Sequence, residues 1–168
     1  MKSKLGLTTL ARAAVMLGLA IAIQSLSLSQ WVTGPAINAI LSVASASIGW
    51  AYGALVGCLT PWMALVMGIL KFAPAAPVVM AGNVTLCLAF GLLYRANKYA
   101  AAGVASLLKF LVMTAGMRLI IARSVKVPAA VMASLTVTQL YTALIGTGVA
   151  LILLQALGKT GVLFDRQP

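Results

Sequence analysis

Few side chains in this sequence are suited to catalysis or metal binding. The chain has no histidine and one acidic residue, Asp165, and its two cysteines, Cys58 and Cys87, lie far apart in apolar runs. General acid–base catalysis, an activated nucleophile or a zinc site each requires a carboxylate, an imidazole or a cluster of thiols. The sequence therefore argues against an enzyme, and it predicts no metal or cofactor site.

Lys109 is the residue whose setting most strongly indicates a function, because it lies inside an apolar run of about residues 100–122. A charge at the centre of a bilayer is costly, and ionisable residues in membrane helices generally face the interior or a cavity. Without a carboxylate in the apolar runs, Lys109 needs water, backbone carbonyl groups, loss of its proton or an anionic ligand. We expect it to contact an anionic or strongly hydrogen-bonding solute, whereas Arg118 is expected to extend outward. A structural role for Lys109 is the alternative.

Uncharged polar residues occur at depths that match the depth of Lys109. Placed on the expected helices at a rise of 1.5 Å per residue, they fall between the middle of the membrane and its outer surface. These further candidate solute-binding residues are Gln24, Asn38, Asn83, Gln139 and Thr142. Each of them taken singly is better explained by a hydrogen bond between helices.

The elements that carry these residues are those of an integral membrane protein. Of the 168 residues, 62% are hydrophobic and 8% are charged, whereas about a quarter of the residues in soluble domains are charged. The net charge of +11 comes from basic residues that flank the apolar runs, a pattern that orients membrane helices and contacts anionic lipid. A nucleic-acid-binding module would instead carry a basic face on a soluble fold. The sequence predicts an all-α protein of the lipid bilayer, with no nucleic-acid partner.

Six transmembrane helices are expected, in a single domain over residues 1–168. A helix needs about 20 apolar residues to cross the membrane, and the uncharged stretch 34–70 is too long for one crossing, so it is expected to fold back near Trp50 to Gly53. The expected spans are about 11–27, 35–48, 51–70, 78–94, 100–122 and 129–157. Two alternatives stay open. The first span could be a cleaved signal peptide, and the stretch 34–70 could hold a re-entrant segment.

The basic residues are distributed unevenly about these six spans. Seven basic residues lie on the side of the termini: Lys2, Lys4, Arg12, Arg95, Lys98, Lys159 and Arg166. Three lie on the opposite side: Lys71, Arg123 and Lys126. Positive residues favour the cytoplasmic side of a membrane, so both termini are expected in the cytoplasm.

Small residues recur at helical spacing in the first span, at Ala14, Gly18 and Ala22. Such a stripe allows helices to approach closely in lipid. Packing within the bundle and an external partner surface explain it equally well.

The sequence also bears on how transport could be energised. The spans contain no Asp, Glu or His for a proton relay, and the chain has no Walker-type phosphate loop for ATP hydrolysis. A solute-binding protein of this kind is expected to be passive or to be driven by a separate protein.

Several features of this chain occur together. They are its length, the expected number of helices, the small residues of the first helix and several short motifs. These motifs are Thr33-Gly34-Pro35 in the first loop, the segment Leu59-Thr60-Pro61-Trp62, and Ala81-Gly82-Asn83 in the fourth helix. With these features the chain resembles the substrate-binding S component of an energy-coupling-factor transporter, and the resemblance covers essentially the whole chain.

This resemblance implies a six-helix protein of a bacterial cell (inner) membrane that works with a transmembrane coupling protein and ATPase subunits. It implies that an Ala-xxx-Ala step in the first helix docks on the coupling protein, with Gly18 here in place of one alanine. It also implies solute binding near the outer surface. The residues implied are Asn83, Lys109, Gln139 and Thr142, with Trp31 on the gating loop.

The resemblance implies a vitamin or related micronutrient as the solute. A cavity without acids disfavours thiamine-like cations, and the lack of histidine disfavours nickel or cobalt. An anionic or neutral solute, such as a carboxylate-bearing vitamin or a flavin, suits Lys109 better. Two other functions stay open, a structural or assembly membrane protein without a ligand and a passive channel or facilitator.

Overall fold

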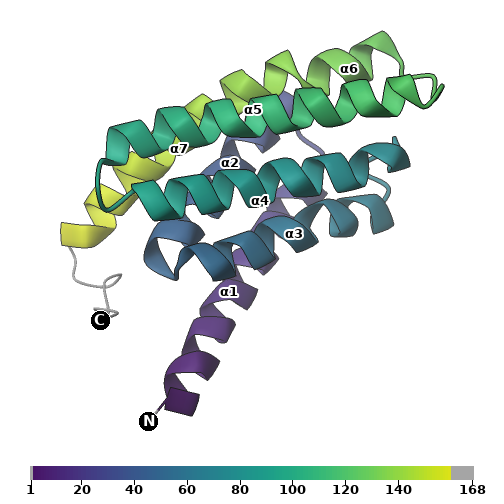
Figure 1. The fold of residues 1–168 in the computed structure, drawn as a ribbon. Helices are drawn as coiled ribbons and strands as arrows, with labels where there is room; N and C mark the ends of the chain where they lie inside the picture. Colours follow the sequence, from purple (N-terminus) through teal and green to yellow (C-terminus); the bar gives the residue numbers. More distant parts are fainter. Residues whose placement is uncertain (1, 160–168) are drawn as a thin grey trace.

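A computed structural model describes the backbone of residues 2–159 and the side chains of residues 7–159, and this part of the chain is helical throughout, without strands. The elements are α1 (Lys2–Ser25), α2 (Gln30–Ser47), α3 (Trp50–Val66), the 3₁₀ turn η1 (Ala73–Ala75), α4 (Ala76–Leu93), α5 (Lys98–Ala122), α6 (Ala129–Leu135) and α7 (Val137–Lys159). Consecutive helices run back and forth along a single bundle (Figure 1).

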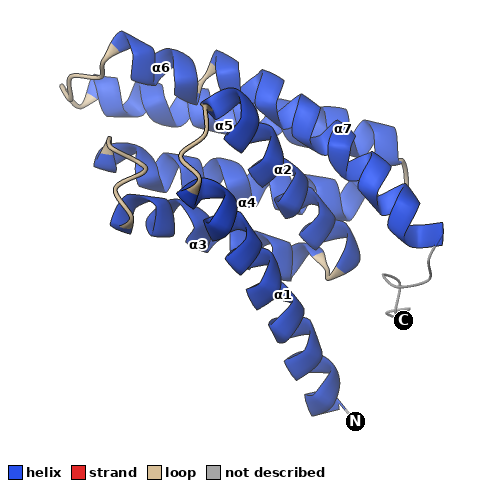
Figure 2. Cartoon of the chain, turned by 180° about the vertical axis from the view of Figure 1, so that it is seen from behind, coloured by secondary structure: helices blue, strands red, loops and turns tan. Residues whose placement is uncertain are grey.

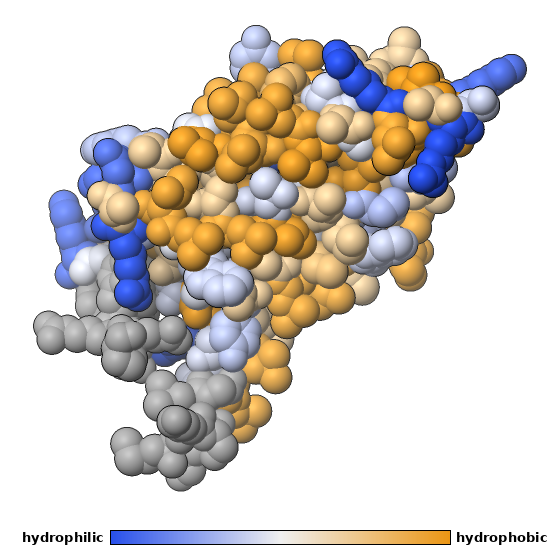
Figure 3. Space-filling model, in the orientation of Figure 1, coloured by the Kyte–Doolittle hydropathy of each residue, from blue (hydrophilic) through white to orange (hydrophobic). Residues whose placement is uncertain are grey.

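The described helices are those of a membrane-spanning protein. Four segments are long and apolar enough to cross a membrane, judged by length and composition: Leu7–Ser25, Ala73–Leu93, Lys98–Ala122 and Ala129–Lys159. The helix Trp50–Val66 is apolar but shorter. Apolar side chains cover the middle of the molecule in Figure 3, and the hydrophilic side chains gather toward its ends. This distribution suits a bundle whose middle lies in hydrocarbon.

The helix α2 forms the centre of the bundle. It packs against α1, α3, α4 and α7, and most of its length from Gly34 to Ser45 is buried. On the other side of the bundle, α4 packs between α3 and α5. The N-terminal part of α1 extends beyond the other helices (Figure 2). The polar residues of α2 and α4 are thereby placed inside the bundle.

The chain folds back between α2 and α3 slightly earlier than the sequence suggested. The turn consists of Ile48 and Gly49, and Gly49 has a φ of +118°, which L residues with a side chain rarely adopt. At its other end α3 stops at Val66 and not near residue 70, because Gly68, with a φ of +73°, terminates the helix.

The expected sixth span, 129–157, is not one continuous helix. It is interrupted at Thr136, whose φ of −122° and ψ of −92° separate α6 from α7. The Thr136 hydroxyl donates to the Met132 carbonyl oxygen at 2.7 Å. Three consecutive β-branched residues, Thr136 to Thr138, weaken the helix at this point, and a threonine that bonds back to the preceding turn often bends one.

A close contact between α2 and α7 depends on Gly146. A methyl group at this position would lie 2.5 Å from the Pro35 carbonyl oxygen and 2.6 Å from Asn38 Cβ. Because a backbone atom is among the obstacles, the two helices would have to move apart. The absence of a side chain at Gly146 therefore sets the distance between α7 and the polar part of α2.

We expect Gly146→Ala to destabilise the protein by about 1–3 kcal/mol, the usual cost of overpacking a tight contact. Gly148 provides a matched control in the same helix, since nothing lies within 4 Å of a methyl group built there. Gly148→Ala should be neutral or stabilising by up to about 1 kcal/mol through its higher helix propensity. Thermal unfolding of both variants in detergent measures the difference. Equal midpoints would contradict the α2–α7 contact.

Candidate functional site

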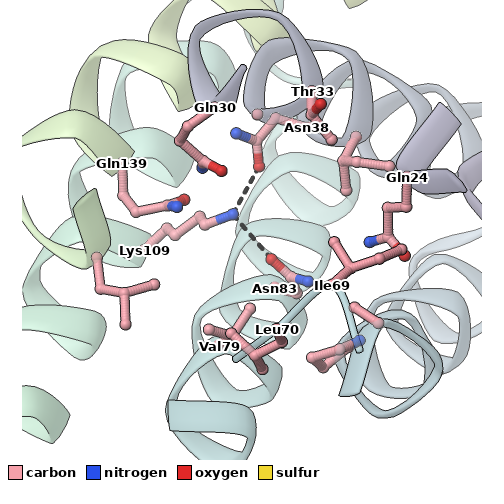
Figure 4. A pocket seen from close by; sticks show the side chains of 15 residues that line it. Gln24, Gln30, Thr33, Asn38, Ile69, Leu70, Val79, Asn83, Lys109 and Gln139 are labelled. Atoms are coloured by element: carbon pink, nitrogen blue, oxygen red, sulfur yellow. Dashed lines mark hydrogen bonds between the residues drawn. The ribbon is translucent and has the colours of Figure 1, made fainter. Parts of the chain in front are cut away.

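The side chain of Lys109 joins three helices in the interior of the bundle. From α5, Nζ donates to Asn38 Oδ1 on α2 at 2.6 Å and to Asn83 Oδ1 on α4 at 2.8 Å. The three side chains are between 1% and 3% exposed. A lysine ammonium group only donates hydrogen bonds, so each amide turns its oxygen toward it. Figure 4 shows both oxygens directed at Nζ.

The neighbouring glycine Gly82 gives Lys109 the room to reach across. A methyl group at Gly82 on α4 would lie 2.5 Å from Met113 Cγ and 3.5 Å from Lys109 Cγ, both on α5. The helices α4 and α5 can therefore lie close together at this level. The Lys109 side chain then needs to span only a short distance to contact Asn83 and Asn38.

The positive charge of Lys109 has hydrogen-bond partners but no counterion. Amide oxygens are neutral acceptors, and no acidic residue occurs among residues 7–159, since the single acid of the chain, Asp165, lies outside the described residues. A buried charge without an opposite charge is expensive even when it is hydrogen-bonded. When Lys109 is protonated, the site therefore has a net positive charge that a bound anion would neutralise.

A cavity of about 150 Å³ adjoins Lys109. It lies where the α1–α2 connection, the segment after α3 and the α6–α7 break meet. Its lining consists of Gln24, Gln30, Thr33, Gly34, Ile37, Asn38, Pro61, Ala64, Ile69, Leu70, Val79, Asn83, Lys109, Leu135 and Gln139. Polar side chains surround the Lys109 ammonium group on one side, and aliphatic side chains close the other (Figure 4).

Five of the seven residues that the sequence suggested for solute binding line this one cavity. They are Gln24, Asn38, Asn83, Lys109 and Gln139. They come from α1, α2, α4, α5 and α7 and are brought together by the packing of the bundle. That they bind a solute stays a prediction, but their convergence on one space is a property of the structure.

The other two suggested residues do not line the cavity. Thr142 is fully buried against α2, where a methyl group at Gly34 would come within 2.9 Å of its Cβ and Cγ2 atoms, and its hydroxyl donates to the Gln139 carbonyl oxygen at 3.3 Å. Trp31 lies in the first turn of α2 and not in a loop. It is exposed, and its ring centroid is 6.4 Å from that of Tyr141. Thr142 thus packs helices together, and Trp31 lies on the outer surface.

Two polar lining residues, Gln30 and Thr33, were missed by the sequence analysis. Both lie at the start of α2, just after the connection that follows Gln24. A concentration of polar residues between Gln24 and Thr33 is visible in the sequence. That signal indicates a polar end of the bundle but does not show which side chains face inward.

The polar groups around Lys109 are incompletely paired. Gln24 is 8% exposed, and its Oε1 atom is buried without a hydrogen-bond partner. Among the described residues, the Nδ2 groups of Asn38 and Asn83 donate to no acceptor, and Gln139 Nε2 makes one long hydrogen bond of 3.4 Å to the Ser134 carbonyl oxygen. The Gln24 oxygen is buried from the cavity itself, and Figure 4 shows it directed away from Lys109, so it is not a group that a molecule in the cavity would contact.

The small-residue stripe of the first helix faces away from the bundle. Ala14, Gly18 and Ala22 are exposed, whereas Ala13 and Ala20 on the other face of α1 are buried. Nothing lies within 4 Å of a methyl group built at Gly18. The stripe therefore does not pack against other helices of this chain. Arg118 is likewise exposed, in contrast to Lys109, as expected from their spacing on α5.

Comparison of this chain with models of protein families, with characterised proteins and with solved structures finds no match.

Proposed function

We propose that this membrane-spanning protein binds a small anionic or strongly hydrogen-bonding solute in the cavity beside Lys109. The observation that carries this proposal is a buried lysine that has no counterion among the described residues and lies at the wall of a cavity lined by amide side chains. Ionisable residues at membrane depth usually mark a solute or ion pathway. The protein would bind its solute without chemical conversion, because the cavity lining contains no acid, histidine or cysteine.

In this proposal the protein is the substrate-binding S component of an energy-coupling-factor importer for a vitamin or related micronutrient. It would be passive itself, and a transmembrane coupling protein and ATPase subunits would energise it. Two observations support this assignment. The spans contain no acids or histidines that could couple transport to protons. In addition, α1 presents an exposed small-residue face at Ala14, Gly18 and Ala22, and nothing lies within 4 Å of a methyl group built at Gly18.

The proposal includes six membrane crossings, with both termini in the cytoplasm of a bacterial cell (inner) membrane. With α2 and α3 as two further crossings, the four long apolar segments would make up the six. Arg95 and Lys98 flank the connection before α5, and Arg123 and Lys126 follow its other end. The larger number of basic residues on the side of Arg95 favours that side as cytoplasmic.

Single cysteines introduced by Ala96→Cys and Lys126→Cys test this topology, since both positions are exposed and lie at opposite ends of α5. In a background where Cys58 and Cys87 are replaced by alanine, a membrane-impermeant maleimide added to intact cells should label the cysteine at 126 and not the one at 96. Labelling at 96 alone would reverse the proposed orientation, and labelling at both would exclude an odd number of crossings between them.

A structural role for Lys109 is the second candidate, and the hydrogen bonds themselves favour it. Because Nζ contacts both Asn38 and Asn83, the lysine ties α2, α4 and α5 together without any ligand. In a membrane, hydrogen bonds between helices are a common means of association. Under this alternative the cavity would contain only water, and the charge would be tolerated for the sake of packing.

Two substitutions separate these candidates. Lys109→Met should weaken binding of the co-purified solute roughly a hundredfold or more, because an interaction with a buried charge is worth a few kcal/mol. Asn83→Asp should retain the fold, with an unfolding midpoint at or above that of the wild type, because its carboxylate neutralises Lys109. It should nevertheless weaken binding of an anionic solute to a similar extent. Native mass spectrometry identifies the retained solute, and calorimetric titration measures its affinity.

Lys126→Met is the matched control for charge removal, since Lys126 is exposed and does not line the cavity. It should bind the solute as the wild type does. If no small molecule is retained by the wild type and Asn83→Asp alters only stability, Lys109 is structural and the proposed binding function is wrong.

Partner docking is tested by Gly18→Leu. Leucine at this exposed position should abolish co-purification with a coupling protein, because bulk prevents close approach of helices, while solute binding remains unchanged. Gly103→Leu on α5 is the control, since Gly103 is also exposed and free of neighbours within 4 Å. An intact complex with Gly18→Leu would show that the α1 face contacts only lipid.

A further inference from the structure

We infer that a groove on the surface of the bundle, between α4 and α5, binds one anionic phospholipid, with an acyl chain along the groove and the phosphate at Arg123. Apolar residues from the start of α4 and from the second half of α5 line this α4–α5 groove, and Arg123 is the charged residue among them. None of these residues lines the cavity beside Lys109. The inference therefore holds or fails independently of the proposed solute binding.

The α4–α5 groove has the length of one membrane leaflet. On α5 it extends from Val112, near the middle of the helix, to Arg123, the residue that follows the last helical turn. This distance is about 16 Å at a rise of 1.5 Å per residue, and half of the hydrocarbon core of a bilayer is about 15 Å thick. An acyl chain that starts at the Arg123 end would therefore reach the middle of the membrane within the groove.

The shape of the groove follows from a close contact between its two helices. A methyl group at Gly116 on α5 would lie 2.7 Å from Val78 Cγ1 on α4, so the helices nearly touch at this level. Pro77 on α4 and Leu119 on α5 line the groove and are exposed, so each helix contributes an apolar wall. A chain lying between these walls would gain dispersion contacts that a chain on a flat helix face lacks.

The backbone at the start of α4 also suits an acyl chain. The first turn of a helix leaves its N–H groups without intrahelical partners, and such groups are costly in hydrocarbon. Pro74 and Pro77 line the groove, and proline has no N–H group. The groove thus presents no free N–H at these two positions.

Arg123 suits a phosphate group at the end of the groove. It is exposed, and its guanidinium group makes no hydrogen bond or ion pair with the described part of the chain. The helix α5 ends here, and Ser124 turns the chain with a φ of +61°. Because α5 is a membrane-crossing segment, its end lies at the level of the lipid headgroups. Arginine binds phosphate oxygens with two parallel hydrogen bonds.

The charges at this end of the bundle favour an anionic headgroup over a zwitterionic one. Lys126, which follows Arg123 closely in the sequence, is exposed as well, and no acid occurs among residues 7–159. A zwitterionic headgroup would bring an ammonium group to a positive surface with no carboxylate to accept it. A phosphatidylglycerol headgroup carries only the charge of the phosphate. Hydrophilic side chains border apolar surface at this end of the molecule (Figure 3).

Native mass spectrometry of the full-length protein tests the inference. The protein in detergent is equilibrated with equal amounts of phosphatidylglycerol and phosphatidylcholine that carry the same acyl chains, and the lipids that stay bound are identified. The wild type should retain one phosphatidylglycerol molecule, preferred about fivefold or more over phosphatidylcholine, which is the effect of one basic side chain on an anionic lipid.

Two pairs of variants assign this preference to the groove. Arg123→Gln should lose it, whereas Arg118→Gln should keep it, since Arg118 is also exposed on α5 but does not line the groove. Ala81→Phe fills the groove and should abolish retention of the lipid. Its control is Ala115→Phe, at an exposed position of α5 outside the groove, which should retain the lipid. Because Arg123 is exposed, its substitution should leave the fold intact, and it decides the test if Ala81→Phe does not fold.

Equal retention of the two lipids by the wild type, or an unchanged preference in Arg123→Gln, would show that the groove is covered by ordinary annular lipid and would overturn the inference. A dimer of the wild type that Ala81→Phe abolishes and Ala115→Phe does not would overturn it as well, because a second copy of the chain would then occupy the groove.

Discussion

The ammonium group of Lys109, on α5, forms hydrogen bonds with residues of two other helices, α2 and α4. The arrangement of the bundle depends on how closely these three helices approach one another. The hydrogen bonds of Lys109 to Asn38 and Asn83 fix α5 against α2 and α4 at one level. The glycines of the same region remove the obstacles, Gly82 between α4 and α5 and Gly146 between α7 and α2. A lysine buried in a membrane-spanning bundle must be hydrogen-bonded, and this requirement determines which neighbours are polar and which are small. The cavity beside it is lined by the remaining polar groups of the same end of the bundle.

The helix α1 connects this interior site with the outer surface of the protein. Gln24, near its C-terminal end, lines the cavity, and Ala22, two residues earlier, belongs to the exposed small-residue face. A solute that contacts Gln24 would restrain the end of α1, which otherwise packs mainly against α2 and α3 and extends beyond the bundle at its N-terminus. Under the proposed function, a partner docked on Ala14, Gly18 and Ala22 would therefore contact the same helix that senses whether the cavity is occupied. Coupling between two sites requires an element that both of them bias, and under the proposed function α1 would be that element.

The sequence predicted an all-helical fold and five of the seven polar residues that line the cavity, for reasons that also explain its errors. Apolar length and flanking charge locate a membrane helix, and the rise per residue then gives the depth of each polar residue along it. Depth alone brought Gln24, Asn38, Asn83, Lys109 and Gln139 to one level. Depth does not give the direction of a side chain around the helix axis, which depends on how helices pack. It therefore did not show that Thr142 is buried against α2 and does not line the cavity. The exposed position of Trp31 depends on where α2 begins. The break at Thr136 depends on local backbone geometry. Neither leaves a clear signal in an apolar sequence.

The choice of asparagine as the partner of Lys109 bears on whether the lysine binds a solute or only packs helices. For packing alone, a carboxylate at position 38 or 83 would serve better than an amide, because it would accept the same hydrogen bond and also cancel the charge. The chain instead satisfies the hydrogen-bond geometry of the lysine with two neutral amides, and no acid among the described residues compensates its charge. Under the proposed function, this arrangement sacrifices stability in the empty protein and regains it when an anion enters. Tight binding of a small molecule requires such a difference, because only groups that are unsatisfied before binding can gain from it.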